Sequence, residues 1–268
     1  MSPRISVGAF YNPHLAAATL DAHGLIEHLA MADPPRPDDP HFAAIRSRFV
    51  LLLHDFLGQL SEPLGPPALE RARRLLALYG SPWAAEHLQR VHTTSGDAFV
   101  DYVFPPLYTE DLLADYVRNA RALQDALARP LVLEPIPTYL HVPLPQLGEV
   151  GFVRRFYAES GCGMLLDVSH AWLSAHYAGI PPREFVADLP LERVVELHVA
   201  GVEPDRDLGG PWIGAAVPDP EILDLAVYAA ERAPDLRAVT FDAFSSALTA
   251  EALRAGVTAI RDRFGLPP

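Results

Sequence analysis

The sequence predicts a (βα)8 TIM barrel, an α/β fold formed by a single domain over residues 1–268. Eight short apolar runs of strand length alternate along the chain with segments of helical spacing. Such alternation favours parallel strands joined by right-handed crossovers, and eight units in about 250 residues match the size of this barrel. A doubly wound sheet is the alternative, but it usually has fewer strands, and no glycine-rich dinucleotide fingerprint follows the first run.

The predicted elements follow one another in regular order. The strands are expected at residues 4–10, 24–31, 48–56, 84–91, 130–136, 163–169, 193–201 and 237–244. The clearest helical segments are residues 66–80, 109–130, 149–161, 219–234 and 249–265. Gly or Pro stands at several helix ends, and Thr109 and Thr249 each precede a Glu, which is typical of helix N-caps.

The charge balance excludes several classes of function. A formal net charge of -13 argues against binding to nucleic acid or to an anionic membrane, because both depend on a basic surface. It is compatible with carboxylates gathered around cations. The chain contains no Lys, so all 21 basic residues are Arg. This excludes Schiff-base chemistry, attachment of pyridoxal phosphate and a P-loop lysine.

Cysteine usage and hydropathy indicate a cytoplasmic protein. The single Cys, Cys162, excludes a disulfide framework and a zinc ribbon, so a reducing compartment is expected. The first residues do not resemble a signal peptide, and no apolar stretch approaches the roughly 18 residues needed to span a bilayer. A serine nucleophile has no support either, because no Gly-x-Ser-x-Gly elbow is present.

Ionisable side chains stand at the carboxyl ends of seven of the eight predicted strands. In a barrel of this type these ends meet at one rim, where the active site is built. Adjacent strand residues face opposite ways, so only one of Glu86 and His87 should face the lumen. The strand-end residues are Glu27 or His28, His54, Glu86 or His87, Glu134, Asp167 with His170, Glu196 or His198, and Asp242.

Taken singly, each of these groups has an ordinary structural explanation. The stretch "GCGMLLDVSHAWLSAH" shows the difficulty, because Asp167 and His170 could be a helix cap, a buried pair or part of a site. Together, however, several imidazoles and carboxylates at one rim would leave too many buried ionisable groups without compensation. Divalent cations would compensate them, and mixed imidazole and carboxylate ligation suits iron, manganese or zinc better than calcium or magnesium.

Three runs give the sequence a resemblance to a known family. They are "GCGMLLDVSHAWLSAHYAGI", "LERVVELHVAG" and "LYTEDLLADYVRNARALQDALARPLVLEPIPTYL". Their order and spacing resemble the multinuclear non-haem iron-dependent oxidative enzymes, the DUF692 family, which includes the methanobactin biosynthesis oxidase. The resemblance extends from about residue 24 to about residue 244.

The resemblance implies a TIM barrel with two or three irons at its mouth. It also implies oxidative modification of cysteine or another residue in a ribosomally made peptide, beside a small partner protein that binds the leader. Glu134, Asp167 and His198 are implied to be catalytic residues as well as ligands. The metal ligands that it implies are His54, His87, Glu134, Asp167, His198 and Asp242.

The chain departs from the family pattern after the seventh strand. The family has a His after the Ala-Gly pair and an Asp-x-His pair further on, whereas residues 201–220 contain no His. One iron position is therefore expected to be altered or lost, which leaves two irons. His170 stands where the family has Asn and is expected to supply a replacement ligand, with Asp205 and Asp207 as alternatives.

Three functions follow from these observations. The first is an iron-dependent oxidative enzyme that uses O2 to modify a ribosomally made peptide. The second is a metal-dependent isomerase or hydrolase of the sugar-isomerase type, which also has imidazole and carboxylate ligands at strand ends. The third is a non-catalytic relative that binds a peptide and holds metal weakly or not at all.

Overall fold

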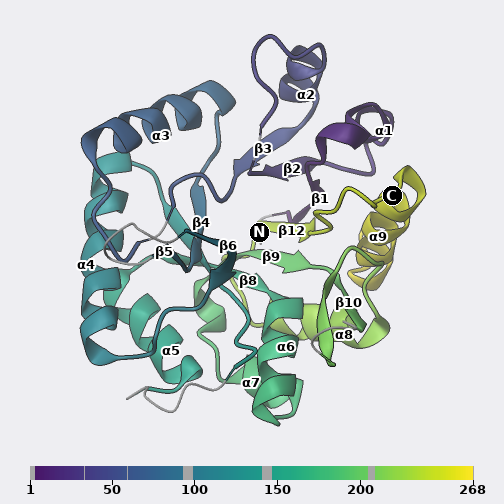
Figure 1. Cartoon of the computed structure of the whole chain (residues 1–268). Helices are drawn as coiled ribbons and strands as arrows, with labels where there is room; N and C mark the ends of the chain where they lie inside the picture. The colour runs from purple at the N-terminus through teal and green to yellow at the C-terminus, as the bar shows by residue number, and fades with distance from the viewer. Residues whose placement is uncertain are drawn as a thin grey trace.

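The computed structural model describes residues 4–267, apart from residues 33, 59, 93–98, 141–146 and 205–208. Eight parallel strands close into a barrel in the order β1-β12-β9-β8-β7-β4-β3-β2 (Figure 1). The strands are β1 Ser6–Phe10, β2 His28–Met31, β3 Val50–Leu53, β4 Ala84–Leu88, β7 Leu131–Pro135, β8 Gly163–Asp167, β9 Val194–Val199 and β12 Ala238–Phe241. Each lies within one of the eight predicted segments, so the predicted fold is confirmed.

Helices surround the barrel and cover the outer face of its strands (Figure 1). The α-helices are α1 Ala16–Asp21, α2 Phe42–Arg48, α3 Pro66–Tyr79, α4 Glu110–Leu127, α5 Glu149–Ser160, α6 Val168–Ala178, α7 Pro182–Ala187, α8 Pro220–Ala230 and α9 Ala250–Arg263, with short 3-10 turns η1 Pro13–Leu15 and η2 Leu191–Arg193. The predicted caps are confirmed, because the hydroxyls of Thr109 and Thr249 accept hydrogen bonds from the amides of Leu112 and Ala252.

Strand β8 is shorter than predicted because helix α6 begins directly after it. The sequence placed strand residues up to Ser169, but the strand ends at Asp167. The Asp167 carboxylate accepts a hydrogen bond from the backbone N–H of His170 and so caps the first turn of α6. This cap turns the chain from extended to helical without a connecting loop.

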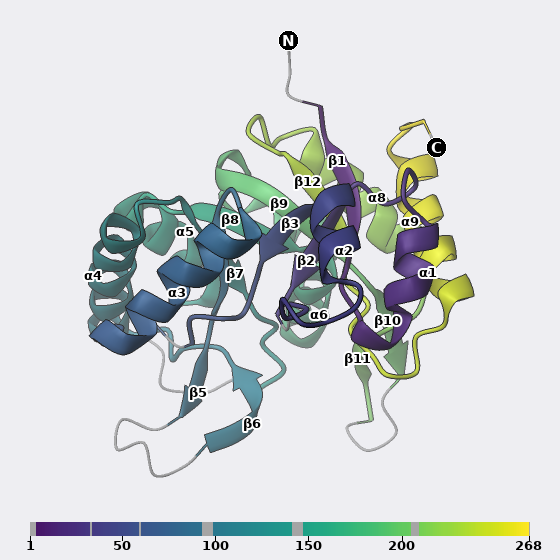
Figure 2. The ribbon, with the colours of Figure 1, turned by 90° about the horizontal axis from the view of Figure 1, so that it is seen from above.

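Two antiparallel hairpins, which the sequence did not predict, follow barrel strands. In the first, β5 Arg90–His92 pairs with β6 Phe99–Phe104, directly after β4. In the second, β10 Gly201–Pro204 pairs with β11 Pro211–Gly214, directly after β9. Figure 2 shows both hairpins on the same side of the barrel. Because each follows the carboxyl end of a barrel strand, they flank the mouth.

The barrel interior is only partly apolar. A small cluster of buried side chains from the strands, including Phe10, Leu52, Val132 and Leu165, fills part of the lumen. The larger apolar core lies between the strands and the surrounding helices. The rest of the lumen holds buried polar and charged side chains. Among the described residues, no helix is long and apolar enough to cross a membrane.

Candidate metal centre

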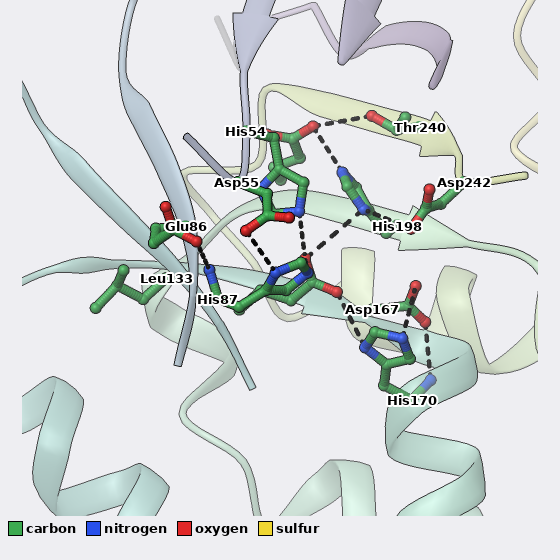
Figure 3. Close-up of polar contacts among 12 residues, drawn as sticks. His54, Asp55, Glu86, His87, Leu133, Asp167, His170, His198, Thr240 and Asp242 are labelled. Carbon is green, nitrogen blue, oxygen red and sulfur yellow. Dashed lines mark hydrogen bonds and ion pairs between the residues drawn. The ribbon is translucent and has the colours of Figure 1, made fainter. Parts of the chain in front are cut away.

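Side chains from separate barrel strands meet at the mouth (Figure 3). His54 follows β3, His87 lies in β4, Glu134 in β7, Asp167 at the end of β8 and His198 in β9. His170 lies in the first turn of α6, and Asp242 follows β12 directly. The structure therefore brings all seven predicted site residues together, as expected where the carboxyl ends of parallel strands converge.

Glu134 lies at the middle of this group and is completely buried. Its Oε2 atom is 2.9 Å from Nε2 of His54, 3.4 Å from Nε2 of His87 and 3.9 Å from Nδ1 of His198. Its Oε1 atom is 3.0 Å from Nδ1 of His170. One carboxylate thus contacts four imidazoles that come from four different elements.

Asp167 and Asp242 form a second set of neighbouring ligand atoms with Glu134 and His198. Oδ1 of Asp167 is used by the helix cap, and Oδ2 is 3.9 Å from Nε2 of His170. Oδ2 of Asp242 is 3.2 Å from Nδ1 of His198. The Asp242 side chain is 20% exposed, whereas those of His198 and Asp167 are buried. The group is therefore closed toward the barrel interior and opens toward the mouth.

Two sets of ligand atoms share Glu134. His54, His87 and Glu134 form one set, and Glu134, Asp167, His198 and Asp242 form the other; within each set the atoms lie within 4.8 Å of one another. Both oxygens of Glu134 and Oδ2 of Asp167 are buried without a well-aligned hydrogen bond. Buried carboxylate oxygens in this state lack the compensation that a cation would supply. The donor set therefore fits one or two divalent metal ions of the iron, manganese or zinc type.

The electrostatics of the group agree with this. Burial alone would raise the pKa of Glu134, but the imidazoles of His87, His170 and His54 hold it well below its usual range. Burial opposes protonation of His87, yet Glu134 and Asp55 raise its pKa to about 9. The negative charge of the carboxylates thus favours the protonated form of the neighbouring imidazole. A metal ion would be attracted to the same place and would compete with those protons.

Asp55 is a member of the group that the sequence did not predict. Its Oδ1 atom is 3.4 Å from Nδ1 of His87, and Asp55, Glu86 and His87 form a third set of neighbouring ligand atoms. Glu86 is buried, and its oxygens accept hydrogen bonds from the amides of Leu57, Gly58 and His87. Glu86 therefore holds the loop after β3, while Asp55 orients His87. The position of Asp55 directly after His54 was the signal available in the sequence.

Glu196 is the second residue whose role the sequence did not predict. Glu196 and His198 were expected as alternatives for one position in the site. In the structure both side chains are buried and contact each other, with Oε1 of Glu196 3.1 Å from Nε2 of His198. Residues two apart on a strand share a face, so the spacing itself contained this information. Asp205 and Asp207, two further candidate ligands in the sequence, lie outside the described residues.

Comparison with known proteins gives a family match over most of the chain. The family model described as "RiPP precursor modification enzyme MbnB/TglH/ChrH" matches residues 27–242. A UPF0276 protein of Paraburkholderia phytofirmans is 32% identical over 205 residues, which are 74% of this chain and 66% of that protein. A UPF0276 protein of Caulobacter vibrioides is 31% identical over 169 residues, 62% of this chain and 59% of that protein. The match thus spans less than two thirds of the length of these relatives.

Solved structures with the same fold are distant in sequence. D-psicose 3-epimerase with D-tagatose, from Clostridium cellulolyticum, is 12% identical, with a TM-score of 0.60 over 97% of this chain and 99% of that one. A xylose isomerase domain containing protein from Salmonella typhimurium is also 12% identical, with a TM-score of 0.63 over 98% and 99% of the two chains. These similarities show the fold alone.

Proposed function

The chain belongs to the MbnB/TglH/ChrH family of RiPP precursor modification enzymes, and we propose that it is an iron-dependent enzyme that uses O2 to modify a ribosomally made peptide. The modified group would be a cysteine or another side chain of that peptide. The observation that carries the proposal is the buried Glu134 carboxylate, which contacts four imidazoles and is shared by two sets of ligand atoms. A shared carboxylate of this kind can bridge two metal ions.

The two ligand sets that share Glu134 support two irons. His54 and His87 would hold one iron, Asp167, His198 and Asp242 would hold the other, and Glu134 would belong to both. The position where the family has a His after the Ala-Gly pair is Val202, which lies in β10 and pairs with Ile213 of β11. A hairpin strand thus stands where the family carries a further ligand. His170 contacts Oε1 of Glu134, the oxygen that the other three imidazoles do not contact, and we propose it as the replacement ligand.

Iron at this site would supply one-electron chemistry with O2 and would polarise a donor atom of the substrate. The chain's own residues control access to it. His87 and His170 are the more exposed imidazoles of the group, with side chains 16% and 13% exposed, so a substrate would approach along the edge that they share with Asp242.

An aromatic wall borders the same centre. Phe10 packs edge-on against His54 and His198, with ring centroids 6.0 and 6.4 Å apart. Phe244, which is 64% exposed, packs edge-on against Phe10 at 5.4 Å. The wall would exclude water from one side of the ligands and offer an apolar contact to a peptide side chain. A small partner protein that binds the leader is part of the proposal, by analogy with the family.

The test begins with metal content. The protein would be expressed without oxygen and with iron supplied, and we expect about two irons per chain and an absorption and paramagnetic-resonance signal that changes when O2 is admitted. A cysteine-containing peptide would then be incubated with the protein and O2 and analysed for a change in mass. Glu134→Gln should lose iron and activity while it stays folded. Glu27→Gln is the matched control. The sequence placed Glu27 or His28 at the carboxyl end of a strand, but β2 begins at His28, so Glu27 lies at the opposite end of the barrel, where it pairs with Arg4 and Arg261.

A metal-dependent isomerase or hydrolase is the second candidate. The set of Glu134, Asp167, His198 and Asp242 favours it, because three carboxylates and one imidazole suit a single divalent ion without redox chemistry. Such an enzyme would act without oxygen and would keep its activity with manganese, cobalt or zinc. A protein that stays folded but holds no metal would instead be the peptide-binding relative. Two irons that react with O2 would contradict both of these functions.

A further inference from the structure

A chain of buried hydrogen bonds runs through the barrel lumen beneath the metal centre. His28 of β2, Thr240 of β12 and Glu196 and His198 of β9 are all at most 1% exposed. The hydroxyl of Ser6 lies 2.8 Å from Nδ1 of His28, and Nε2 of His28 lies 2.9 Å from Oγ1 of Thr240. Figure 3 shows Thr240 and His198 on the same side of the centre. The chain links the amino-terminal end of the barrel to a proposed metal ligand.

The direction of each hydrogen bond in this chain is fixed by the groups present. The hydroxyl of Thr240 donates to Oε1 of Glu196 at 2.9 Å, because a carboxylate can only accept. Toward His28 the Thr240 oxygen must therefore accept, and Nε2–H of His28 donates to it. Burial lowers the pKa of His28 to about 4, so the ring is neutral near pH 7. Its Nδ1 atom then accepts the hydrogen of the Ser6 hydroxyl.

Glu196 receives three donors at the end of this chain. Oε1 accepts from Thr240 and faces Nε2 of His198 at 3.1 Å, while Oε2 accepts from the indole N–H of Trp83 at 3.0 Å. A hydrogen of His198 must therefore lie on Nε2. Nδ1 faces Oδ2 of Asp242 at 3.2 Å and Oε2 of Glu134 at 3.9 Å, and without metal it donates a hydrogen bond to Asp242. Because both of these carboxylates belong to the ligand sets and Glu196 does not, Nδ1 is the nitrogen at which a metal would replace the hydrogen.

We propose that Glu196 is a positioning residue that fixes His198 in the Nε2–H tautomer, so that His198 binds metal through Nδ1. A metal-bound imidazole generally donates its other N–H to a carboxylate or carbonyl, which sets the ring orientation and strengthens the ligand. Here that carboxylate is Glu196, which accepts hydrogen bonds from Thr240 in β12 and from Trp83, the residue directly before β4. The inference rests on the metal centre of the proposed function, but not on iron, O2 or a peptide.

The packing of the lumen leaves space for this series of hydrogen bonds at Gly8. A Cβ atom on Gly8 would overlap the carbonyl oxygen of His28 and would lie 2.5 Å from its Nε2 atom. Only glycine at this position lets the His28 ring occupy the lumen. Barrel interiors are usually filled by bulky aliphatic side chains, and replacing buried polar pairs with apolar groups is often neutral or stabilising. The stability of the barrel therefore does not require polar side chains at this level. The orientation of His198 does require them.

The test compares three variants of the metal-free full chain. Glu196→Gln keeps the size of the side chain but removes its charge and one of its two acceptor oxygens. Its amide NH2 must then face either Trp83 or the donors Thr240 and His198, so the acceptor for His198 is weakened or lost. Thr240→Val removes one of the three donors with little change in shape, and serves where Glu196→Gln fails to fold. Tyr116→Phe is the matched control, because the Tyr116 hydroxyl is buried and donates to the carbonyl of Gln89, away from the Glu196 chain.

Two readouts separate orientation from stability. Each protein would be titrated with Co2+ under nitrogen and followed by absorption, and its thermal unfolding would be measured without metal. The Zn2+-loaded protein with 15N-labelled histidine would show by NMR which ring nitrogen of His198 bears hydrogen. We expect Glu196→Gln to weaken Co2+ binding about 10- to 100-fold and Thr240→Val to weaken it less. Tyr116→Phe should lower the unfolding temperature and leave Co2+ affinity within twofold of the unmodified protein.

Two results would overturn the inference alone: Co2+ affinity of Glu196→Gln within twofold of the unmodified protein, or hydrogen on Nδ1 of His198 in the zinc protein. Failure of the unmodified protein to bind either ion would overturn it together with the metal centre. Weakened Co2+ binding in Glu196→Gln, with an iron protein that does not oxidise a peptide, supports the inference and removes only the proposed function.

Discussion

The metal-free protein should lose stability as the pH rises from about 6.5 to about 9, because of His87. The pKa of this imidazole is raised from 6.5 to about 9, against the effect of burial, by the carboxylates of Glu134 and Asp55. The folded state therefore binds a proton more tightly than the unfolded state does. The resulting stabilisation is complete below pH 6.5 and is lost as the pH rises through 9. At about 1.4 kcal/mol per pH unit, the loss from this group is about 3 kcal/mol.

The variant Glu134→Gln shows how much of this fall in stability with pH depends on the Glu134 carboxylate. Glu134 is the largest influence that raises the His87 pKa, so the variant should show a much shallower fall in stability between pH 6.5 and 9. Burial and Asp55 raise the pKa of Glu86 to about 8, and this adds a fall in stability of the same sign to both proteins. Glu27→Gln, at the far end of the barrel, should keep the slope of the unmodified protein.

The assay is urea unfolding of the metal-free proteins at intervals of half a pH unit, with the free energy of unfolding extrapolated to water. Addition of Zn2+ should raise the free energy of unfolding most at high pH, where protons no longer compete for the imidazoles. Equal slopes for Glu134→Gln and the unmodified protein would refute the reasoning, because they would show that Glu134 does not control protonation of the group.

Three further results are expected. Gly8→Ala should lower the free energy of unfolding by at least about 2 kcal/mol in chemical denaturation, because the added Cβ meets the His28 ring and carbonyl. Gly151→Ala in helix α5 is the control. A Cβ there meets nothing within 4 Å, so this variant should be neutral or stabilising. Asp167→Asn should weaken Co2+ binding in an absorption titration. Its unfolding temperature should change little, because the amide oxygen can still accept the hydrogen bond from the backbone N–H of His170. Asp167→Ala should lower the free energy of unfolding by about 1 kcal/mol more, because it loses that cap. Co2+ affinity of the unmodified protein should rise between pH 6.5 and 9 by up to about tenfold per pH unit for each proton displaced, and a flat profile in the same titration would contradict competition between metal and protons.

The barrel could be predicted because its strands are buried on both faces. Such strands appear in the sequence as short apolar runs, and their polar carboxyl ends, such as His54 and Glu134, are visible without any knowledge of contacts. Parallel pairing then brings those ends to one rim. The two hairpins were missed because their strands are short and pair locally after a barrel strand, where a long apolar run such as residues 193–201 conceals the break at Ala200.

The alternation rule also explains which site residues were hard to predict. Adjacent residues such as Glu86 and His87 leave the strand on opposite faces, so His87 contacts Glu134 while Glu86 holds the loop after β3. Their side-chain ends nevertheless meet again beside Asp55, which the alternation rule does not predict. The same rule puts Glu196 and His198 on one face, so one of them need not exclude the other. What the sequence could not show is the direction of the hydrogen bonds between them, because that depends on Thr240 from another strand.

Asp167 shows why one carboxylate can be both a helix cap and a site residue. One of its oxygens caps helix α6 through the amide of His170, and the other faces the His170 ring across the centre. The ring in turn contacts Oε1 of Glu134, so the start of the helix and the position of this imidazole are fixed by the same carboxylate. A rotation of Asp167 toward a metal would therefore weaken the cap unless only Oδ2 took part. The geometry favours that division, because Oδ1 is already hydrogen-bonded and Oδ2 is buried without such a partner.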